Sequence, residues 1–347
     1  MKCQVARYLI FPLILGACTN LFGERRPQRA LAQADYSAIN QQALPVPLQF
    51  DYSEARYIPQ LVAITTSVAG KQFDQACINL QQARSVNDSS LLAALHVWCL
   101  TANGNLSAAQ QIMQTAVTEL SVDQHLAYAG AILNERIENY ELAYSLYKDL
   151  YSVHEDRMTL LACARTSLLS GLPAECIAHL DHLLLTEAPS SQQMMMRASA
   201  FAELQRYAEA MSILQKLLAD WPEDPALLQQ TSLISFEFAR QADSVALYAD
   251  SAELLLKLIE LDPQNSQACL CLARCYSAND AANEAIDAYQ RCIEIEPHNV
   301  EACHELSDVF VAYNNKQQAR QILQQLLKQP ISASQSKETN DKLRALK

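Results

Sequence analysis

Glycine is scarce in this chain, with only 6 residues among 347. β-Hairpins and dinucleotide-binding folds of the Rossmann type use glycine at tight turns and close backbone approaches, so the composition argues against both. Alanine, leucine, glutamine and glutamate are abundant instead, and these residues favour helix. Because 50% of the residues are hydrophobic, we expect a folded helical protein with a large core rather than a disordered chain.

Positive charge is also in short supply. The chain has 26 Lys and Arg residues against 38 Asp and Glu residues, which gives a formal net charge of -12. Nucleic acids and anionic surfaces are bound through basic faces that contact phosphate groups. The composition therefore argues against nucleic acid as a ligand and favours basic or neutral partners.

Motifs of catalysis and metal binding are missing from the sequence. It has no glycine-rich phosphate loop, no His-Glu-x-x-His helix, no serine elbow and no Cys-x-x-Cys pair. Cys176, His179 and His182 are spaced three apart, but on a helix the cysteine is expected to face the core and the histidines the solvent. The sequence therefore predicts a protein that is not an enzyme and needs no cofactor or metal.

A long hydrophobic run is absent as well. The apolar run from Tyr8 to Ala17 is ten residues long, whereas a helix needs about 20 residues to cross a membrane. Lys2 and Arg7 give it a positive beginning, and small residues follow it, as in a secretory signal peptide. The alternative is an uncleaved apolar helix, which Pro12 would interrupt.

The end of this run, Leu15-Gly16-Ala17-Cys18, resembles the lipobox of bacterial lipoproteins. The resemblance implies that residues 1–17 are removed, that Cys18 is lipidated, and that residues 18–55 form a lipid-anchored tether. Several acyl chains on one cysteine would give a stable membrane anchor. Thr19 stands where an aspartate commonly retains such proteins at the inner membrane. In a Gram-negative cell the resemblance thus implies the outer membrane, with the protein facing the periplasm.

A unit of about 34 residues repeats along the chain and is clearest at 266–299. Its apolar and small residues recur at helical spacing in two groups, which predicts two amphipathic helices that end before Pro297. These residues are Cys269, Leu272, Ala273 and Tyr276, then Ala285, Ile286, Tyr289, Cys292 and Ile293. The unit at 225–265 is longer than the others by about two helical turns, so we expect a longer first helix or an extended turn there.

The positions of Leu272, Ala273, Tyr276, Ala285, Tyr289, Cys292 and Pro297 resemble the tetratricopeptide repeat, or TPR. The resemblance implies an all-α fold: a right-handed superhelical solenoid of about eight helix-turn-helix repeats over residues 56–333. Residues 334–347 are polar and are expected to form a C-terminal capping helix. In this family the concave surface, lined by the first helix of each repeat, usually binds extended or helical peptides.

Cysteine is frequent for an exported protein, with 11 residues in all. Nine follow Cys18, and most of them replace a small apolar residue of the repeat, so we expect buried, unpaired thiols. These are Cys77, Cys99, Cys163, Cys176, Cys269, Cys271, Cys275, Cys292 and Cys303. A disulfide among them and a metal site remain alternatives, and Cys269, Cys292 and Cys303 are expected near one repeat junction.

Six residues are candidates for a peptide-binding surface because they fall on the predicted concave face of the first helices. They are Trp98, Leu161, Arg165, Leu168, Met195 and Arg274. An apolar strip beside two fixed cations would suit a peptide with an apolar face and a carboxylate. The alternative is that the leucines and Trp98 pack between repeats and that the arginines are solvated.

The combination of a lipobox with TPR-like repeats resembles lipoproteins that assist assembly of a pilus, a secretin or outer-membrane proteins. It implies a non-enzymatic scaffold that binds a protein or peptide and is held at the membrane by lipid. The alternative is a cytoplasmic TPR regulator or cochaperone with reduced thiols. A clamp for a chaperone tail would need regularly placed basic residues, and only Arg165 and Arg274 are suitably located.

Overall fold

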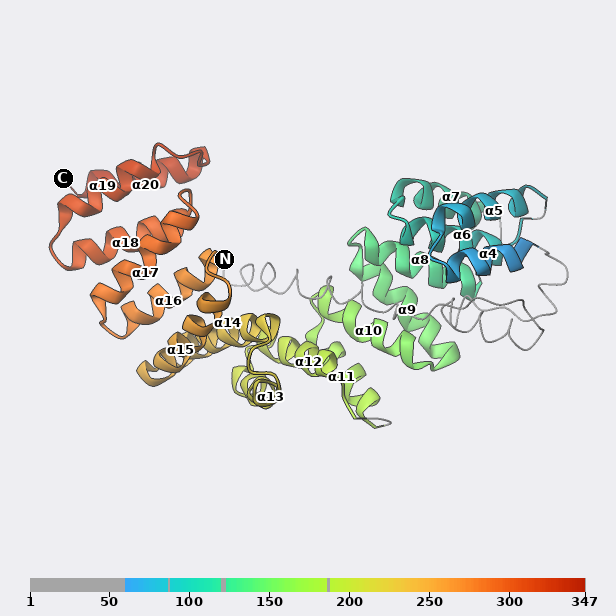
Figure 1. The fold of residues 1–347 in the computed structure, drawn as a ribbon, viewed down its shortest axis with the longest axis horizontal. Helices are drawn as coiled ribbons and strands as arrows, with labels where there is room; N and C mark the ends of the chain where they lie inside the picture. Colours follow the sequence, from blue (N-terminus) through green and yellow to red (C-terminus); the bar gives the residue numbers. More distant parts are fainter. Residues whose placement is uncertain (1–59, 87, 120–122, 186–187, 347) are drawn as a thin grey trace. The chain divides into compact units, whose positions relative to one another are not determined.

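The computed structural model describes residues 60–86, 88–119, 123–185 and 188–346. Within these ranges the regular elements are 17 α-helices and there is no strand (Figure 1). The prediction of an all-α fold is confirmed. The predicted signal peptide, Cys18 and the tether at 18–55 lie outside the described residues.

The helices belong to two compact units, which meet between Pro189 and Ser190 in the sequence. The N-terminal unit contains α4 (Gln60–Ala69), α5 (Phe73–Val86), α6 (Ser90–Ala102), α7 (Leu106–Glu119), α8 (Gln124–Arg136), α9 (Tyr140–His154), α10 (Arg157–Leu169) and α11 (Pro173–Leu184). The C-terminal unit contains α12 (Ser191–Glu203), α13 (Tyr207–Asp220), α14 (Pro225–Ala242), α15 (Val245–Leu261), α16 (Ser266–Ala278), α17 (Ala282–Ile295), α18 (Val300–Ala312), α19 (Lys316–Leu326) and α20 (Ala333–Ala345).

Consecutive helices from α4 to α19 form eight pairs joined by short turns, and α20 follows them singly. Every one of these turns contains one residue with left-handed backbone geometry. The eight residues are Lys71, Gly104, Glu138, Gly171, Gln205, Asp243, Asp280 and Asn314. A short turn of this kind reverses the chain, so each pair is an antiparallel helical hairpin. The predicted number of about eight repeats is confirmed.

The first helices of seven successive pairs, and α20, begin in the same way. At each N-cap a Ser, Asp or Asn side chain accepts a hydrogen bond from the backbone of the first turn, which satisfies an otherwise unpaired N–H group. The caps are Ser89, Asp123, Asp156, Ser190, Asp224, Asn265, Asn299 and Ser332. Most of them recur at the spacing of the sequence repeat, so local capping sets the period of the fold.

The long repeat at 225–265 is longer in its helices. Helix α14 has 18 residues and α15 has 17, compared with 13 in α16 and 14 in α17. The turn between α14 and α15 still closes through one left-handed residue, Asp243. Of the two expectations, the longer first helix is confirmed in α14, and the extended turn is wrong. The second helix, α15, is longer as well.

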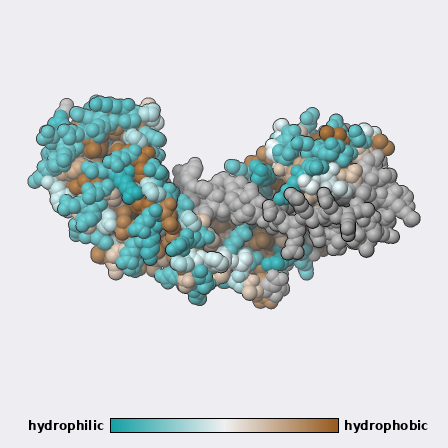
Figure 2. All heavy atoms as spheres, viewed as in Figure 1, coloured by the Kyte–Doolittle hydropathy of each residue, from teal (hydrophilic) through white to brown (hydrophobic). Residues whose placement is uncertain are grey.

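Each unit has its own hydrophobic core between the first and second helices. Small side chains lie at the closest approach of a pair: Ala273 in α16 and Ala285 in α17 are both fully buried, as expected from the repeat. On the C-terminal unit, hydrophilic residues cover most of the visible surface and hydrophobic residues show between them (Figure 2). No helix among the described residues is long and apolar enough to cross a membrane.

Candidate functional site

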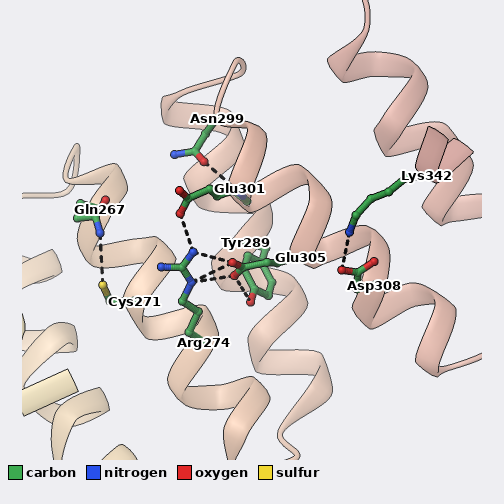
Figure 3. Close-up of polar contacts among 10 residues, drawn as sticks. Gln267, Cys271, Arg274, Tyr289, Asn299, Glu301, Glu305, Asp308 and Lys342 are labelled. Carbon is green, nitrogen blue, oxygen red and sulfur yellow. Dashed lines mark hydrogen bonds and ion pairs between the residues drawn. The ribbon is translucent and has the colours of Figure 1, made fainter. Parts of the chain in front are cut away.

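A polar network joins helices α16, α17 and α18 of the C-terminal unit (Figure 3). Arg274 of α16 donates through Nε and Nη2 to both carboxylate oxygens of Glu305 in α18, at 2.8 and 2.6 Å. Its Nη2 also donates to Oε2 of Glu301, at 2.7 Å. Tyr289 of α17 donates to Oε2 of Glu305, at 3.0 Å. The network thus joins three consecutive helices.

Burial and charge fix the protonation of this network. Tyr289 is buried, and burial followed by the Glu305 charge holds the pKa of its phenol above the usual value. Burial disfavours the Arg274 charge, but the hydrogen bond to Glu305, the charge of Glu305 and the hydrogen bond to Glu301 hold its pKa above the usual value. Arg274 is therefore a permanent cation shared by two carboxylates, which leaves the group with one surplus negative charge.

Helix α20 makes a separate set of polar contacts with α18. Lys342 donates to Oδ2 of Asp308 in α18, at 2.6 Å (Figure 3). His304 of α18 lies with Nε2 2.9 Å from the Thr339 hydroxyl, and that hydroxyl donates its own hydrogen to the Gln335 carbonyl at 2.7 Å. The Nε2 atom of His304 is therefore the donor in this buried contact. These polar contacts hold α20 against α18.

The packing of α18 against its neighbours leaves an acidic surface exposed to solvent. Glu301, Glu305 and Asp308 share one face of α18, since they are spaced four and three residues apart, and Glu338 of α20 approaches His304 at 3.8 Å. The side chains of Glu301, Asp308 and Glu338 are 66%, 63% and 65% exposed. We call Glu301, Glu305, Asp308 and Glu338 the carboxylate face. Arg274 and Lys342 are the two cations that pair with it.

The N-terminal unit contains a related network. Arg165 of α10 donates to both oxygens of Glu135 in α8, at 2.6 and 2.8 Å, and Tyr147 of α9 donates to the same carboxylate at 3.3 Å. The Arg165 and Glu135 side chains are only 14% and 13% exposed. Burial first, and then the Glu135 charge, hold the pKa of Tyr147 well above its usual value. Sequence reasoning missed both glutamates and both tyrosines as partners of the arginines.

The structure shows where the predicted peptide-binding residues lie. Trp98 is 4% exposed and meets the Phe73 ring edge to face at 6.0 Å, so it belongs to the core of the N-terminal unit. Leu168 is buried too. The structure therefore does not present these two side chains to solvent, and their part in ligand binding stays a prediction.

The other four predicted residues lie at the boundary of core and solvent. Leu161 and Met195 are half-buried. The side chains of Arg165 and Arg274 are mostly buried and paired with glutamates, so in this structure their charges are already matched. Leu161 and Arg165 belong to the N-terminal unit, and Met195 and Arg274 to the C-terminal unit.

The cysteines follow their predicted environments, and of the two histidines predicted to face solvent His182 is exposed but His179 is half-buried. None of the nine cysteines after Cys18 is in a disulfide; Cys77 is half-buried and the other eight are buried. Cys176 faces the core, whereas His179 and His182 meet Tyr144 and Tyr151 of α9, at 3.2 and 3.1 Å. Within the described ranges, no three His, Cys, Asp or Glu side chains are grouped so that they could hold a metal ion.

Comparison with known families identifies the repeat. Two tetratricopeptide repeat models match the chain, one at residues 194–224 and one at residues 278–330. The chain has tetratricopeptide repeats at these residues. The first match spans α12 and α13, and the second runs from the end of α16 through α19, so it contains Glu301, Glu305 and Asp308 of the carboxylate face. Tetratricopeptide repeats are generally protein-interaction scaffolds. No curated protein matches the chain.

Solved structures with a similar fold include other tetratricopeptide repeat proteins. One from Parabacteroides merdae is 14% identical, with a TM-score of 0.49 over 73% of this chain and 98% of its own. MamA from Desulfovibrio magneticus is 16% identical, with a TM-score of 0.44 over 53% of this chain and 93% of its own. The Cut9-Hcn1 hetero-tetramer of the APC/C is 13% identical, with a TM-score of 0.47 over 86% of this chain and 57% of its own.

Proposed function

We propose that the chain is a non-enzymatic scaffold that binds a segment of another protein at the carboxylate face. The observation that carries this proposal is the exposure of three carboxylates on α18 and α20, of which Glu301 is held by Arg274, Asp308 by Lys342, and Glu338 lies near His304. Side chains needed for packing are buried, whereas Glu301, Asp308 and Glu338 project into solvent from a rigid base. Such an arrangement is suited to recognition because its geometry is set before a partner arrives.

The charge of the face selects the chemistry of the partner. Four carboxylates are matched by Arg274 and Lys342 alone, and the whole chain carries -12. A segment with lysine or arginine side chains would complement this surplus, with Glu301, Glu338 and Asp308 as the exposed contacts. This partner differs from the carboxylate-bearing peptide that the two arginines suggested, since both arginines are already paired.

Binding of defined peptides tests the proposal. Titration of the full chain with a lysine-rich peptide and a glutamate-rich peptide of equal length should show binding of the first and not of the second. Glu301→Lys combined with Asp308→Lys should weaken binding at least about tenfold. The matched control is Glu253→Lys with Glu260→Lys, which makes the same charge change on the exposed side of α15. Equal losses in both double variants would refute a specific site on α18.

We further propose that this scaffold is a lipoprotein anchored through Cys18, held in the cell envelope, and at the outer membrane facing the periplasm in a Gram-negative cell. There it would assist assembly of a pilus, a secretin or outer-membrane proteins. The support is the sequence at residues 1–18. In a bacterial host fed an alkyne fatty acid, the wild type should take up the label and Cys18→Ser should not. An unlabelled, membrane-bound chain with Met1 intact would refute anchoring.

A cytoplasmic regulator or cochaperone is the second candidate, and the nine cysteines outside any disulfide favour it. The labelling experiment separates the two. A soluble chain that keeps Met1 and takes up no label would support the cytoplasmic candidate, whereas a labelled chain in the membrane fraction would exclude it.

A further inference from the structure

A cavity of about 190 Å³ lies in the C-terminal unit, at the end of α17, α18 and α19 that is remote from the turns at Asp280 and Asn314. Apolar side chains from all three helices and from the connection between α17 and α18 line it: Ile293, Pro297, Cys303, Ile322 and Leu326. An apolar cavity of about 150 Å³ is large enough to hold benzene. The cavity therefore has room for an apolar body of about six carbon atoms.

The cavity has a closed floor and an open mouth. Cys303 and Leu326 are 2% and 1% exposed, so they form the floor. Pro297, Gln325 and Lys328 also line the cavity but are exposed to solvent, so they lie at its mouth. A small molecule can therefore enter from solvent and reach buried apolar side chains without displacing a helix.

The mouth of the cavity carries a positive charge, although the chain has a net charge of -12. Of the described residues that line the cavity, none is acidic and Lys328 is the single cation. Within the described ranges, no hydrogen bond or ion pair engages the Lys328 side chain, whereas Lys342 is already paired with Asp308. Gln325 and Gln329 add side-chain amides that can donate hydrogen bonds. The mouth is therefore suited to an anionic group.

We propose that this cavity is a binding site for a small carboxylic acid with a hydrocarbon chain of about six carbons. The ligand's carboxylate would pair with the Lys328 ammonium group and accept hydrogen bonds from the amides of Gln325 and Gln329. Its hydrocarbon chain would lie on Cys303 and Leu326. A single cation favours a monoanion such as a carboxylate over a doubly charged phosphate.

The site is separate from the carboxylate face. Cys303 is two residues from both Glu301 and Glu305, and two residues correspond to about 200° around a helix. The cavity thus adjoins the side of α18 opposite the carboxylate face. Binding of the small acid can therefore be measured without the protein partner, and loss of one site leaves the other in place.

Titration of the full chain, followed by NMR of the ligand, tests the proposal with hexanoate, its uncharged analogue hexanamide and the short acid acetate. Hexanoate should bind saturably. Hexanamide should bind about fivefold more weakly because it lacks the charge, and acetate should not bind measurably because it lacks the hydrocarbon chain. Lys328→Gln should weaken hexanoate binding to the level of hexanamide and leave hexanamide binding unchanged. The matched control is Lys316→Gln, which makes the same charge change at the start of α19 and should leave both affinities unchanged.

Photolabelling of the wild-type chain locates the site. A hexanoate analogue with a diazirine in its chain should label segments that contain Ile293, Cys303 or Leu326 on irradiation, and excess hexanoate should suppress the label. The proposal would be overturned by equal affinities for hexanoate and hexanamide, or by equal losses in Lys328→Gln and Lys316→Gln. A suppressible label confined to other segments, or no saturable binding of hexanoate, would overturn it as well.

Discussion

Replacement of Arg165 by methionine should destabilise the N-terminal unit, because it leaves the Glu135 carboxylate without its cation. In the structure the Arg165 guanidinium holds Glu135 by two hydrogen bonds, at 2.6 and 2.8 Å, and both side chains are about six-sevenths buried. Methionine preserves most of the side-chain volume but removes the cation. The Glu135 carboxylate is then left with the Tyr147 hydroxyl, at 3.3 Å.

The magnitude follows from burial. Loss of one partner from a fully buried ion pair costs about 3 to 5 kcal/mol, and an exposed pair contributes about 0 to 1 kcal/mol. Because Arg165 and Glu135 are slightly exposed, we expect Arg165→Met to lower the unfolding free energy by about 2 to 3 kcal/mol. Removing both charges, with Glu135→Leu added, should cost only about 1 kcal/mol, because the remaining penalty is the unpaired Tyr147 hydroxyl.

Native-state hydrogen exchange is the appropriate assay, since repeat arrays need not unfold in one step. In Arg165→Met the amides of α8 and α10 should exchange about 30- to 150-fold faster, and most of this increase should disappear in the double variant. The control is Arg240→Met: Arg240 lies 2.5 Å from Glu237 but is 55% exposed, so exchange in α14 should change less than about threefold. The reasoning would be refuted if the effects of Arg165→Met and Glu135→Leu on exchange were additive. It would also be refuted if Arg165→Met accelerated exchange no more than Arg240→Met.

Three further predictions concern burial in the N-terminal unit and the single exposed tryptophan. Iodide should quench the fluorescence of the Trp98→Phe variant, which retains Trp221, whose exposed fraction is 59%. It should quench the Trp221→Phe variant poorly, because that variant retains only the buried Trp98. Similar quenching of both variants would contradict the buried position of Trp98. A Cβ atom at Gly130 would lie 2.8 Å from the flexible terminal methyl group of Met113. In urea denaturation, Gly130→Ala should therefore change the unfolding free energy by less than about 1 kcal/mol, whereas the larger Gly130→Ile should lower it by about 2 kcal/mol. Burial lowers the pKa of His96 to about 4. The contribution of His96 to the unfolding free energy should therefore be complete above pH 6.5, where the imidazole is neutral in the unfolded state too, and should decrease toward pH 4. If a His96→Gln variant loses the same stability over this pH range, His96 is not the source of the loss.

The period and the helix pairs could be predicted from the sequence because they depend on local chemistry. Apolar spacing in each half of the unit, proline after the second helix and Ser, Asp or Asn before the first are all visible without a structure. Asp224 and Asn265, which are further apart than the other successive caps, also mark the long repeat. The turns were harder to locate, because glycine occupies only two of the eight left-handed positions and Glu138, Gln205 and others fill the rest.

The peptide-binding residues could not be predicted by counting along the helices, and one position shows why. Trp98, Arg165 and Arg274 are each the ninth residue of a first helix. Trp98 is covered by Phe73 and its neighbours, Arg165 is held by Glu135, and Arg274 is held by Glu305. Helical periodicity predicts the face on which a side chain begins, but its exposure depends on what the adjacent repeats place beside it, and those contacts come from other helices of the chain.

The two arginine networks nevertheless share a pattern that a sequence can reveal. In each, the arginine is the ninth residue of a first helix and the tyrosine is the eighth residue of a second helix: Tyr147 in α9 and Tyr289 in α17. The glutamate differs, since Glu135 lies in the first helix before its arginine and Glu305 in the first helix after it. A buried tyrosine hydroxyl fixes where a carboxylate must lie, and the neighbouring first helix on either side can supply it. An arginine at the ninth position beside such a tyrosine therefore predicts a structural ion pair, as at Arg165 and Arg274, and the exposed carboxylates of α18 are the surface that we propose for recognition.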